Sequence, residues 1–283
     1  MSSLLSSKQY NLYAYDSQGL PAYDDQPMNK TNLIRIHHAD YIDDIPFWIS
    51  CTEGKESVLE VGCGHGRVAL PLLEAGREVL GVDIDLPALQ SLREELKEKD
   101  LDIQNRAKVV HEDFVKFQTE GSFGSVIIPC NTYSTFLLDD RQSILSKAYN
   151  LLNPGGKFAA SVPNPVQVRS LFDELRANPD QGGSDLETSF SHPETGYPVQ
   201  VSSSLIAKEQ SLGWDWIYDH LHPDGQVDRF IRSTEHYLTT PETYQQELIE
   251  VGFKAIRLLG DFDNNEYAED SPYLILCGIK LGV

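Results

Sequence analysis

The stretch Val58-Leu59-Glu60-Val61-Gly62-Cys63-Gly64-His65-Gly66-Arg67 decides the fold of this 283-residue chain. It opens as a short apolar run, continues with three glycines at alternate positions, and leads into an amphipathic run that begins at Val68. This order predicts a buried strand, a tight loop and the start of a helix. Glycines let the backbone turn sharply and let a ligand lie close to it. Loops of this kind, at the carboxyl edge of a parallel sheet, bind nucleotide-like cofactors.

The glycine spacing narrows the choice of ligand. A dinucleotide fingerprint requires G-x-G-x-x-G, whereas the third glycine here, Gly66, comes one residue early and Arg67 stands in the expected position. Glu60 precedes the glycines, where a carboxylate is a poor neighbour for a pyrophosphate but suits a ligand that carries an ammonium group. The alternative is a glycine-rich turn with no ligand.

The pattern E-x-G-x-G-x-G resembles motif I of the class I S-adenosylmethionine-dependent methyltransferases. The resemblance implies S-adenosyl-L-methionine as cofactor, held by Glu60, Gly62, Cys63, Gly64 and Gly66. Methyl transfer needs no thiol, so we interpret Cys63 as a small loop residue.

A second predicted strand, 78–83, ends in Asp83, which comes 21 positions after Gly62. An acid at about this distance from the loop is placed to accept both ribose hydroxyls. Ile84 follows and is expected to lie against the adenine. Asp85 stands before Leu86 and Pro87, and we interpret it as the N-cap of the next helix.

Residues 107–114 predict a third strand and a turn. In the family that the chain resembles, an acid here binds the adenine amino group and the next residue packs near the ring, which implies these roles for Asp113 and Phe114. The alternative for Asp113 is an ordinary loop acid. His111 is one residue too early and is interpreted as part of the strand end.

Fourth and fifth strands are predicted at 125–129 and 158–162, although family members often carry an acid where Ser125 stands. Asn131 and Tyr133 follow the fourth strand and are the candidates for a catalytic role, with Asn131 also expected at the cofactor. Tyr133 and Asn164, which follows the fifth strand, are expected to orient the acceptor. Loop capping is the alternative for all three, and no base dyad is recognisable.

These elements predict an α/β fold. The resemblance implies the Rossmann-like seven-stranded sheet of class I methyltransferases, with an antiparallel insertion after strand five. The predicted divisions are an N-terminal arm or lid (1–30, with Tyr10, Tyr13, Tyr15 and Tyr23), a cofactor-binding core (31–165), the insertion (166–240), and a closing helix with the last two strands (241–283).

The insertion is predicted to hold three antiparallel strands, at 198–206, 212–221 and 227–237. It resembles the insertion of glycine N-methyltransferase and the amino-sugar N,N-dimethyltransferases, which covers the active site or forms a dimer contact. A homodimer through this element is therefore an open expectation. Trp214 and Trp216 share a strand face, and we favour sheet core over a substrate platform for them. Arg232 is expected either to clamp an acceptor carboxylate or to form a cross-strand pair with an acid.

Composition excludes several classes of partner. The formal net charge of −20 argues against nucleic acid and against an anionic membrane surface. No apolar run is long enough to cross a bilayer and no cationic, apolar leader opens the chain, which predicts a cytoplasmic protein. The four cysteines lack paired spacing, and His37 and His38 are interpreted as exposed or capping residues, so no metal site is expected.

Three functions remain open on the sequence. The first is methyl transfer to a nitrogen of a small molecule. The second is O-methylation of a carboxylate or hydroxyl on a small metabolite or peptide. The third is a cofactor-binding protein that has lost catalysis. The intact motif I and the two acids, Asp83 and Asp113, speak against the third.

Overall fold

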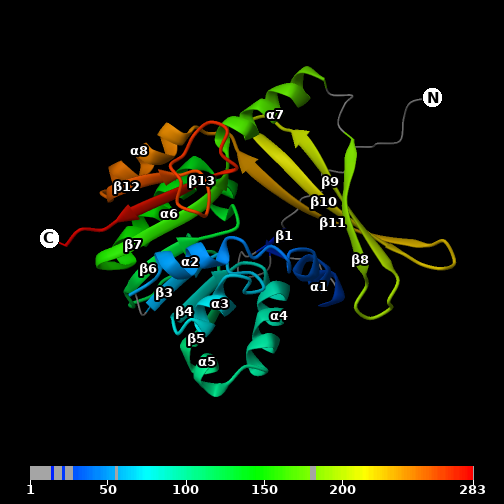
Figure 1. Ribbon diagram of the computed structural model, residues 1–283, viewed down its shortest axis with the longest axis horizontal. Coiled ribbons are helices and arrows are strands. Elements are labelled where there is room, and N and C mark those ends of the chain that lie inside the picture. Colours follow the sequence, from blue (N-terminus) through cyan, green and yellow to red (C-terminus); the bar gives the residue numbers. More distant parts are fainter. Residues whose placement is uncertain (1–13, 16–20, 23–27, 55–56, 179–182, 283) are drawn as a thin grey trace.

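The computed structural model describes residues 14–15, 21–22, 28–54, 57–178 and 183–282. A seven-stranded sheet forms the centre of the molecule, and a four-stranded antiparallel sheet extends from it (Figure 1). The α/β Rossmann-like fold with an antiparallel insertion is thereby confirmed. No helix among these residues is long and apolar enough to cross a membrane.

The central sheet has the order β12-β13-β7-β6-β3-β4-β5. Its strands in chain order are β3 (Ser57–Val61), β4 (Glu78–Asp83), β5 (Ala107–His111), β6 (Phe123–Ile128), β7 (Leu152–Pro163), β12 (Lys254–Leu259) and β13 (Tyr273–Ile279). The first five pair in parallel, while β13 runs antiparallel to both β7 and β12. The strand order reverses between β3 and β6, so the ends of these two strands form the switch point where ligands of such sheets bind.

Helices cover both faces of this sheet, because its inner strands are apolar on both sides. Val58 and Ile127 face one layer, formed by α2 (Ile45–Cys51), α3 (Ala69–Glu74) and α4 (Leu86–Lys97). Leu59 and Val126, each one residue away, face the other layer, formed by α6 (Leu138–Leu151) and α8 (Pro241–Val251). A short α5 (Leu101–Arg106) leads from α4 into β5.

The helix cap predicted from the sequence is present, and a second helix ends at a glycine. The Asp85 carboxylate accepts a hydrogen bond of 3.0 Å from the backbone N–H of Ala88, which confirms Asp85 as the N-cap of α4. Gly252 ends α8 with a φ of 110°, a left-handed conformation that favours glycine.

The insertion differs from the prediction by one strand. It contains four strands in the order β11-β10-β9-β8: β8 (Ser184–Ser191), β9 (Pro198–Ala207), β10 (Ser211–Leu221) and β11 (Val227–Tyr237). The helix α7 (Pro165–Ala177) connects β7 to this sheet. The prediction of three strands was wrong because β8 is an exposed edge strand, almost all of whose side chains face solvent. It therefore lacks the apolar alternation by which strands are recognised.

The helix α1 (Met28–His37) lies beneath the insertion strands and beside α4 (Figure 1). Leu33 is buried against Val199, Val201 and Tyr218 of the insertion. The boundary predicted at residue 30 therefore falls inside a helix that packs against the insertion. Of the tyrosines assigned to the N-terminal arm, Tyr10, Tyr13 and Tyr23 lie outside the described residues. The strand β1 (Ala14–Tyr15) pairs with β2 (Pro21–Ala22).

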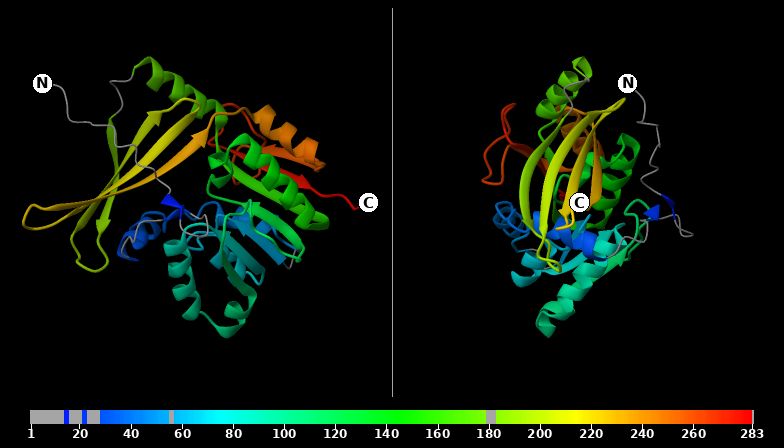
Figure 2. Two further views of the ribbon diagram at one scale, coloured as in Figure 1. Left: turned by 180° about the vertical axis from the view of Figure 1, so that it is seen from behind. Right: turned by 90° about the vertical axis from the view of Figure 1, so that its right-hand side faces the viewer.

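The views in Figure 2 show the insertion as a curved sheet that extends past the core, with its long strands side by side. On β10 and β11, residues that face each other across the register share a face of the sheet. Trp214 pairs with Thr234, and Trp216 pairs with Arg232. We call the face that carries these four residues the inner face of the insertion, because its side chains contact the core and α1.

Candidate active site

The glycine loop after β3 turns beneath the start of α3. Gly66 has a φ of 83°, and a Cβ there would lie 2.4 Å from Cδ1 of Leu92, so this glycine is required for close packing of the loop against α4. Gly64 has a φ of 49°, and a Cβ there would meet only Oδ2 of Asp83, at 3.9 Å. The space beside Gly64 is therefore open on the side of the predicted ribose acid. The Cys63 thiol is buried against Gly81, so only the backbone of Cys63 can face a ligand.

Asp83 ends β4 next to this loop. Its Oδ2 accepts a hydrogen bond of 2.7 Å from the N–H of Gly64, and its Oδ1 accepts one of 2.8 Å from the N–H of Asp85. Each oxygen of a carboxylate can accept a second hydrogen bond, so both remain able to accept a ribose hydroxyl. Burial raises the pKa of Asp83, while the two N–H groups favour its ionised form.

Glu60 lies near the end of β3 and is only 2% exposed. Its Oε2 is buried without a hydrogen-bond partner among the described residues. Burial raises the pKa of Glu60 to about 8, against the opposite effect of nearby Arg67. A buried carboxyl oxygen that lacks a partner is costly, and a ligand ammonium group would supply the missing donor.

The residues predicted around the adenine lie where β4 and β5 end. Oδ1 of Asp113 accepts a hydrogen bond of 2.9 Å from the N–H of Val115, and Ile84 is half-buried at the end of β4. Phe114 is 4% exposed, and its ring stacks on Phe117 inside the core. The apolar core holds the Phe114 ring in this structure, and its place near the adenine stays a prediction. The adenine role of Asp113 stays a prediction.

His111 is the last residue of β5, as interpreted from the sequence, and its Nε2 lies 3.0 Å from the carbonyl oxygen of Ile84.

Arg67 connects the glycine loop to the segment that precedes it in the chain. Its two terminal nitrogens each lie 2.6 Å from a different oxygen of Asp44, and Nη2 also lies 2.9 Å from Sγ of Cys130. Asp44 is buried and accepts a further bond from the indole N–H of Trp48. A bidentate arginine–carboxylate pair fixes geometry as well as charge. The residue that breaks the dinucleotide pattern thus fixes the loop against α2.

The chain leaves β6 in a strained conformation. Cys130 and Asn131 have consecutive positive φ values of 58° and 63°. Non-glycine residues rarely adopt this conformation, and such strain collects at functional sites. The backbone of Asn131 is held by Ser161 and Ser134 at the end of β6, and the cofactor and catalytic roles of its side chain stay predictions.

The other two residues assigned to the acceptor are structural. Tyr133 is fully buried, and its hydroxyl donates a hydrogen bond of 2.8 Å to Glu247. Asn164 is 1% exposed and caps α7 by accepting the N–H of Val166. Its amide nitrogen donates to two carbonyl oxygens, and its Oδ1 also accepts the hydroxyl of Tyr267. Direct acceptor contact by either side chain was therefore a wrong prediction, since the core and a helix cap use their polar atoms.

The inner face of the insertion reaches the core at two points. Nη2 of Arg232 lies 3.1 Å from Oδ2 of Asp85. Nδ1 of His236 lies 2.7 Å from Oγ of Ser134, in the short helix η1 (Thr132–Thr135) that follows β6. Arg232 thus pairs with an acid, as one of the two expectations had it, but the acid lies in the core and not on a neighbouring strand.

His37 and His38 line the same region, so their interpretation as exposed or capping residues was wrong. Both are half-buried, their rings stack at 4.4 Å, and His37 meets the ring of Trp216 edge-on at 4.9 Å. Burial, aided by neighbouring His37 and Arg67, lowers the pKa of His38 to about 4. Burial also lowers the pKa of His236 to about 4.

Trp214 and Trp216 are half-buried, and their rings stack at 5.5 Å. The indole N–H of Trp214 is buried without a partner among the described residues, as is Nδ1 of His65 in the glycine loop. Together with Glu60, three of the buried polar groups that lack partners therefore lie along the glycine loop and the inner face. Native proteins pair such groups, so a ligand is the natural source of the missing partners.

Comparisons with known proteins agree with this geometry. Residues 58–156 match a family model described as a methyltransferase domain. The Bacillus subtilis methyltransferase-like protein YqeM is 23% identical over 244 residues, which cover 84% of this chain and 90% of that protein. A methyltransferase of Geobacillus kaustophilus is 34% identical over 156 residues, covering 53% of this chain and 66% of that protein.

Among solved structures, an S-adenosylmethionine-dependent methyltransferase from Clostridium acetobutylicum superposes with a TM-score of 0.70 at 15% identity, covering 90% of this chain and 99% of that one. The amino pentose methyltransferase CalS10 of Micromonospora echinaspora, with S-adenosylmethionine bound, gives a TM-score of 0.59 at 14% identity, covering 86% and 91%. This chain belongs to the class I S-adenosylmethionine-dependent methyltransferases. The methyltransferase therefore uses S-adenosyl-L-methionine as its cofactor.

The residues present fit this cofactor. Its ammonium group would meet the buried carboxyl of Glu60, its ribose would meet Asp83, and the open space at Gly64 would take the ligand between them. When bound, the cofactor supplies a methyl group activated on a sulfonium. The sequence did not reveal the contributions of Asp44, Ser134 and His236, because each depends on a pairing over more than 20 residues.

Proposed function

We propose that this methyltransferase transfers a methyl group to a nitrogen of a small-molecule acceptor, bound between the end of β6 and the inner face of the insertion. In this proposal, residues 31–165 and 241–283 bind the cofactor, and residues 166–240 cover the acceptor. The observation that carries the proposal is the contact of Arg232 and His236 with the cofactor edge of the core.

The positive charge that the acceptor nitrogen gains in the reaction suits the aromatic side chains of the inner face. A neutral amine attacks the methyl carbon, the bond from carbon to sulfur breaks with its electrons on sulfur, and the positive charge passes from sulfur to nitrogen. Trp214 and Trp216 lie stacked on the inner face. Aromatic rings stabilise cations by about 0.5–2 kcal/mol, so they favour an acceptor that becomes cationic. The indole N–H of Trp214 could donate to an oxygen of the same acceptor.

The nearby bases favour nitrogen over a hydroxyl acceptor. An alcohol or phenol must lose its proton during attack, which requires a base whose pKa lies near the working pH. His38 and His236 have pKa values lowered to about 4 by burial, so both are weak bases. A neutral amine has its lone pair available and needs no such base. The structural likeness to an amino pentose methyltransferase is in line with an amine.

The test is a product assay. The full chain is incubated with S-adenosylmethionine carrying a labelled methyl group and with matched panels of primary and secondary amines, phenols and carboxylic acids. We expect label on amines, located on nitrogen by mass spectrometry. Label only on oxygen would overturn the nitrogen assignment, and no transfer to any panel despite tight cofactor binding would favour a protein that has lost catalysis.

A matched pair of variants tests the site itself. Trp214→Phe keeps the ring and removes the N–H donor, so we expect a raised KM for the acceptor with unchanged cofactor affinity. Trp48→Phe removes an indole N–H that already bonds Asp44 inside the core, and we expect it to lower stability instead. If both variants alter only stability, the acceptor does not lie at Trp214.

A further inference from the structure

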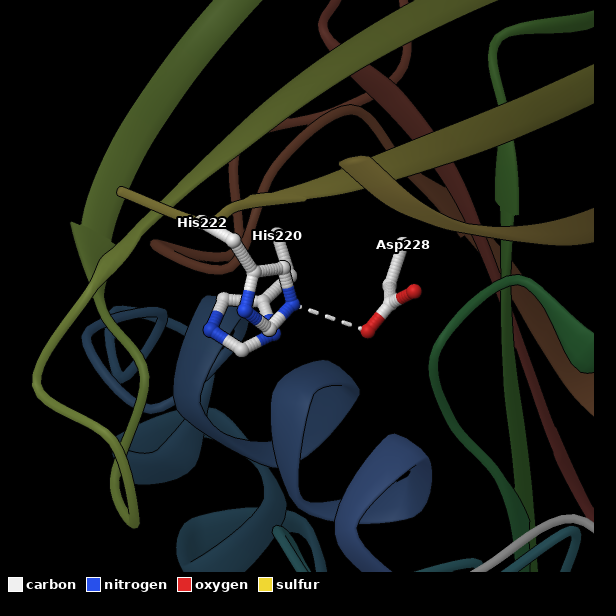
Figure 3. A group of neighbouring side chains, drawn as sticks. All are labelled: His220, His222 and Asp228. Carbon is white, nitrogen blue, oxygen red and sulfur yellow. Dashed lines mark hydrogen bonds and ion pairs between the residues drawn. The ribbon is translucent and has the colours of Figure 1, made fainter. Parts of the chain in front are cut away.

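A second cluster of polar side chains lies at the far end of the insertion. His220 is the last residue of β10 on the inner face, and His222 is the first residue after β10. Asp228 lies near the start of β11 (Figure 3). One possible metal-ligand atom from each of the three residues lies within 4.8 Å of the others. The methyl-transfer chemistry proposed above does not use any of these residues.

The strand geometry explains why the three side chains meet. Residues two apart on a strand point to the same face, which brings His220 and His222 together. The register of β10 and β11 places Asp228 directly opposite His220. Nε2 of His222 lies 2.9 Å from Oδ2 of Asp228, as the dashed line in Figure 3 marks. The hairpin itself therefore assembles the cluster.

Neighbouring residues hold the imidazole of His220 in place. Its ring stacks on His192 at 4.2 Å and lies 4.3 Å from the ring of His222. Its Nε2 lies 2.9 Å from the hydroxyl of Thr195, and Nδ1 of His192 accepts backbone N–H groups of the same turn. Metal-binding histidines generally have such a second hydrogen bond, because it fixes the ring and its tautomer.

We propose that His220, His222 and Asp228 form a binding site for a zinc ion. Two imidazoles and one carboxylate are a ligand set that zinc accepts, whereas magnesium and calcium prefer oxygen ligands alone. Three protein ligands leave one tetrahedral position for water or for a group from another molecule. The ion would join β10 to β11 at the end of the insertion that lies farthest along these strands from the contact between His236 and Ser134.

Binding requires small side-chain adjustments within the cluster, whose ligand atoms now lie between 2.9 Å and at most 4.8 Å apart. Zinc bonds of about 2.0–2.2 Å place ligand atoms roughly 3.3–3.5 Å apart in a tetrahedral site. His222 and Asp228 can reach this spacing by side-chain rotation, because their side chains are 26% and 75% exposed. The buried and stacked His220 is the fixed ligand toward which they move.

The test uses the full chain after treatment with a chelator and dialysis. Calorimetric titration with zinc chloride at pH 7.5 should show one saturable site, and magnesium chloride should show none. Asp228→Asn and His222→Ala should each weaken zinc binding at least about tenfold, since even outer partners of a metal site contribute 10–100-fold. Binding should also weaken in acid, because metal ligands must be deprotonated to bind the ion.

Asp219→Asn is the matched control. Asp219 is next to His220 in the chain but lies on the opposite face, where it pairs with Arg229, so zinc affinity should not change in this variant. Cobalt supplies a second readout that does not depend on stability: visible bands without a thiolate charge-transfer band indicate nitrogen and oxygen ligands. The proposal is overturned if zinc fails to bind, if Asp228→Asn and His222→Ala bind zinc as tightly as the parent, or if the cobalt spectrum shows thiolate ligation.

Discussion

Arg232 of the insertion and Asp85 of the core form an ion pair of 3.1 Å directly beside the predicted ribose acid. The same Asp85 caps α4 through its Oδ1, and its backbone N–H donates to Asp83. A single residue of the core, Asp85, thus contacts the inner face of the insertion, the N-terminus of α4 and the predicted ribose acid Asp83. The position of the insertion is thereby coupled to the cofactor edge of the sheet.

Loss of the ion pair between Arg232 and Asp85 should lower the turnover of the acceptor more than it lowers the affinity for the cofactor. Arg232→Ala removes one of the two contacts between the inner face and the core, so we expect turnover to fall about tenfold or more, because a misplaced acceptor reacts slowly. Affinity for the cofactor should change less than about threefold, since Asp83 and Glu60 remain in place. Initial rates and calorimetry on the same preparation measure the two effects.

Arg229→Ala is the control for that variant. Arg229 lies on the outer face of β11, where it pairs with Asp219 at 2.7 Å. It should leave turnover unchanged. Equal losses of turnover in the two variants would indicate a general loosening of the sheet, with no specific role for the pair of Arg232 and Asp85.

The second prediction is that Asp83 binds the ribose of the cofactor. Asp83→Ala removes the acceptors for both ribose hydroxyls and should cost about 1–3 kcal/mol of affinity for S-adenosylhomocysteine. Asp85→Asn keeps an oxygen for the helix cap and should leave that affinity nearly unchanged. Calorimetry with each variant, and with NAD as a ligand that should not bind, measures the effect. Equal weakening in both variants would show that Asp83 does not hold the ribose.

The raised pKa of Glu60 leads to the prediction that a proton is released when the cofactor binds. The pKa of Glu60 is raised to about 8 by burial, so the cofactor-free chain holds a proton there at pH 7. The ammonium group of the cofactor favours the ionised carboxylate, so binding should expel that proton. Cofactor affinity should therefore rise between about pH 5.5 and 7.5. Binding enthalpies in two buffers with different ionisation enthalpies measure the proton release, which should be absent in Glu60→Gln.

The same shift has a consequence for folding. Between about pH 4.5 and 8 the folded chain retains a proton on Glu60 that the unfolded chain has lost, because the folded pKa is the higher one. The free energy of unfolding of the cofactor-free chain should therefore decrease across this range as pH rises. Glu60→Gln should remove this part of the pH dependence. Urea unfolding at several pH values would contradict the prediction if the two chains gave parallel curves.

The cofactor half of the site was predictable because it is local. Glu60, the glycines and Asp83 occupy strand ends and one loop, and short sequence patterns determine both. The acceptor half depends on pairings that no local pattern encodes. Ser134 meets His236 over 102 residues, and Asp85 meets Arg232 over a longer separation still. Such contacts arise only when the insertion folds back on the core.

The errors on Tyr133 and Asn164 have the same physical origin. Both follow strands at the carboxyl edge of the sheet, so their positions in the chain suggested a site. Both side chains are buried and bonded inside the protein. The hydroxyl of Tyr133 donates to the carboxylate of Glu247 in α8. The amide of Asn164 donates to the carbonyl oxygens of Glu269 and Ser271. A sequence pattern gives the end of a strand but not the direction of the side chain that follows it.

The structural role of Tyr133 leads to a stability prediction. Glu247 accepts hydrogen bonds from Tyr133 and Arg141, and the carboxylate and guanidinium are buried, with side-chain exposures of 4% and 3%. Glu247→Gln leaves the Arg141 charge buried without its counter-ion and should cost about 3–5 kcal/mol of unfolding free energy. Tyr133→Phe removes one hydrogen bond while the ion pair persists, and should cost about 1–3 kcal/mol.

Urea unfolding of the two variants measures these costs, and initial rates under conditions where both remain folded separate structure from catalysis. We expect Tyr133→Phe to retain most of its turnover, because its hydroxyl is bonded to Glu247 and lies in the core together with Tyr244 and Phe158. A large loss of turnover without a loss of stability would contradict this. It would mean that Tyr133 exchanges Glu247 for the acceptor during the reaction, so the short helix after β6 would have to move when the acceptor binds.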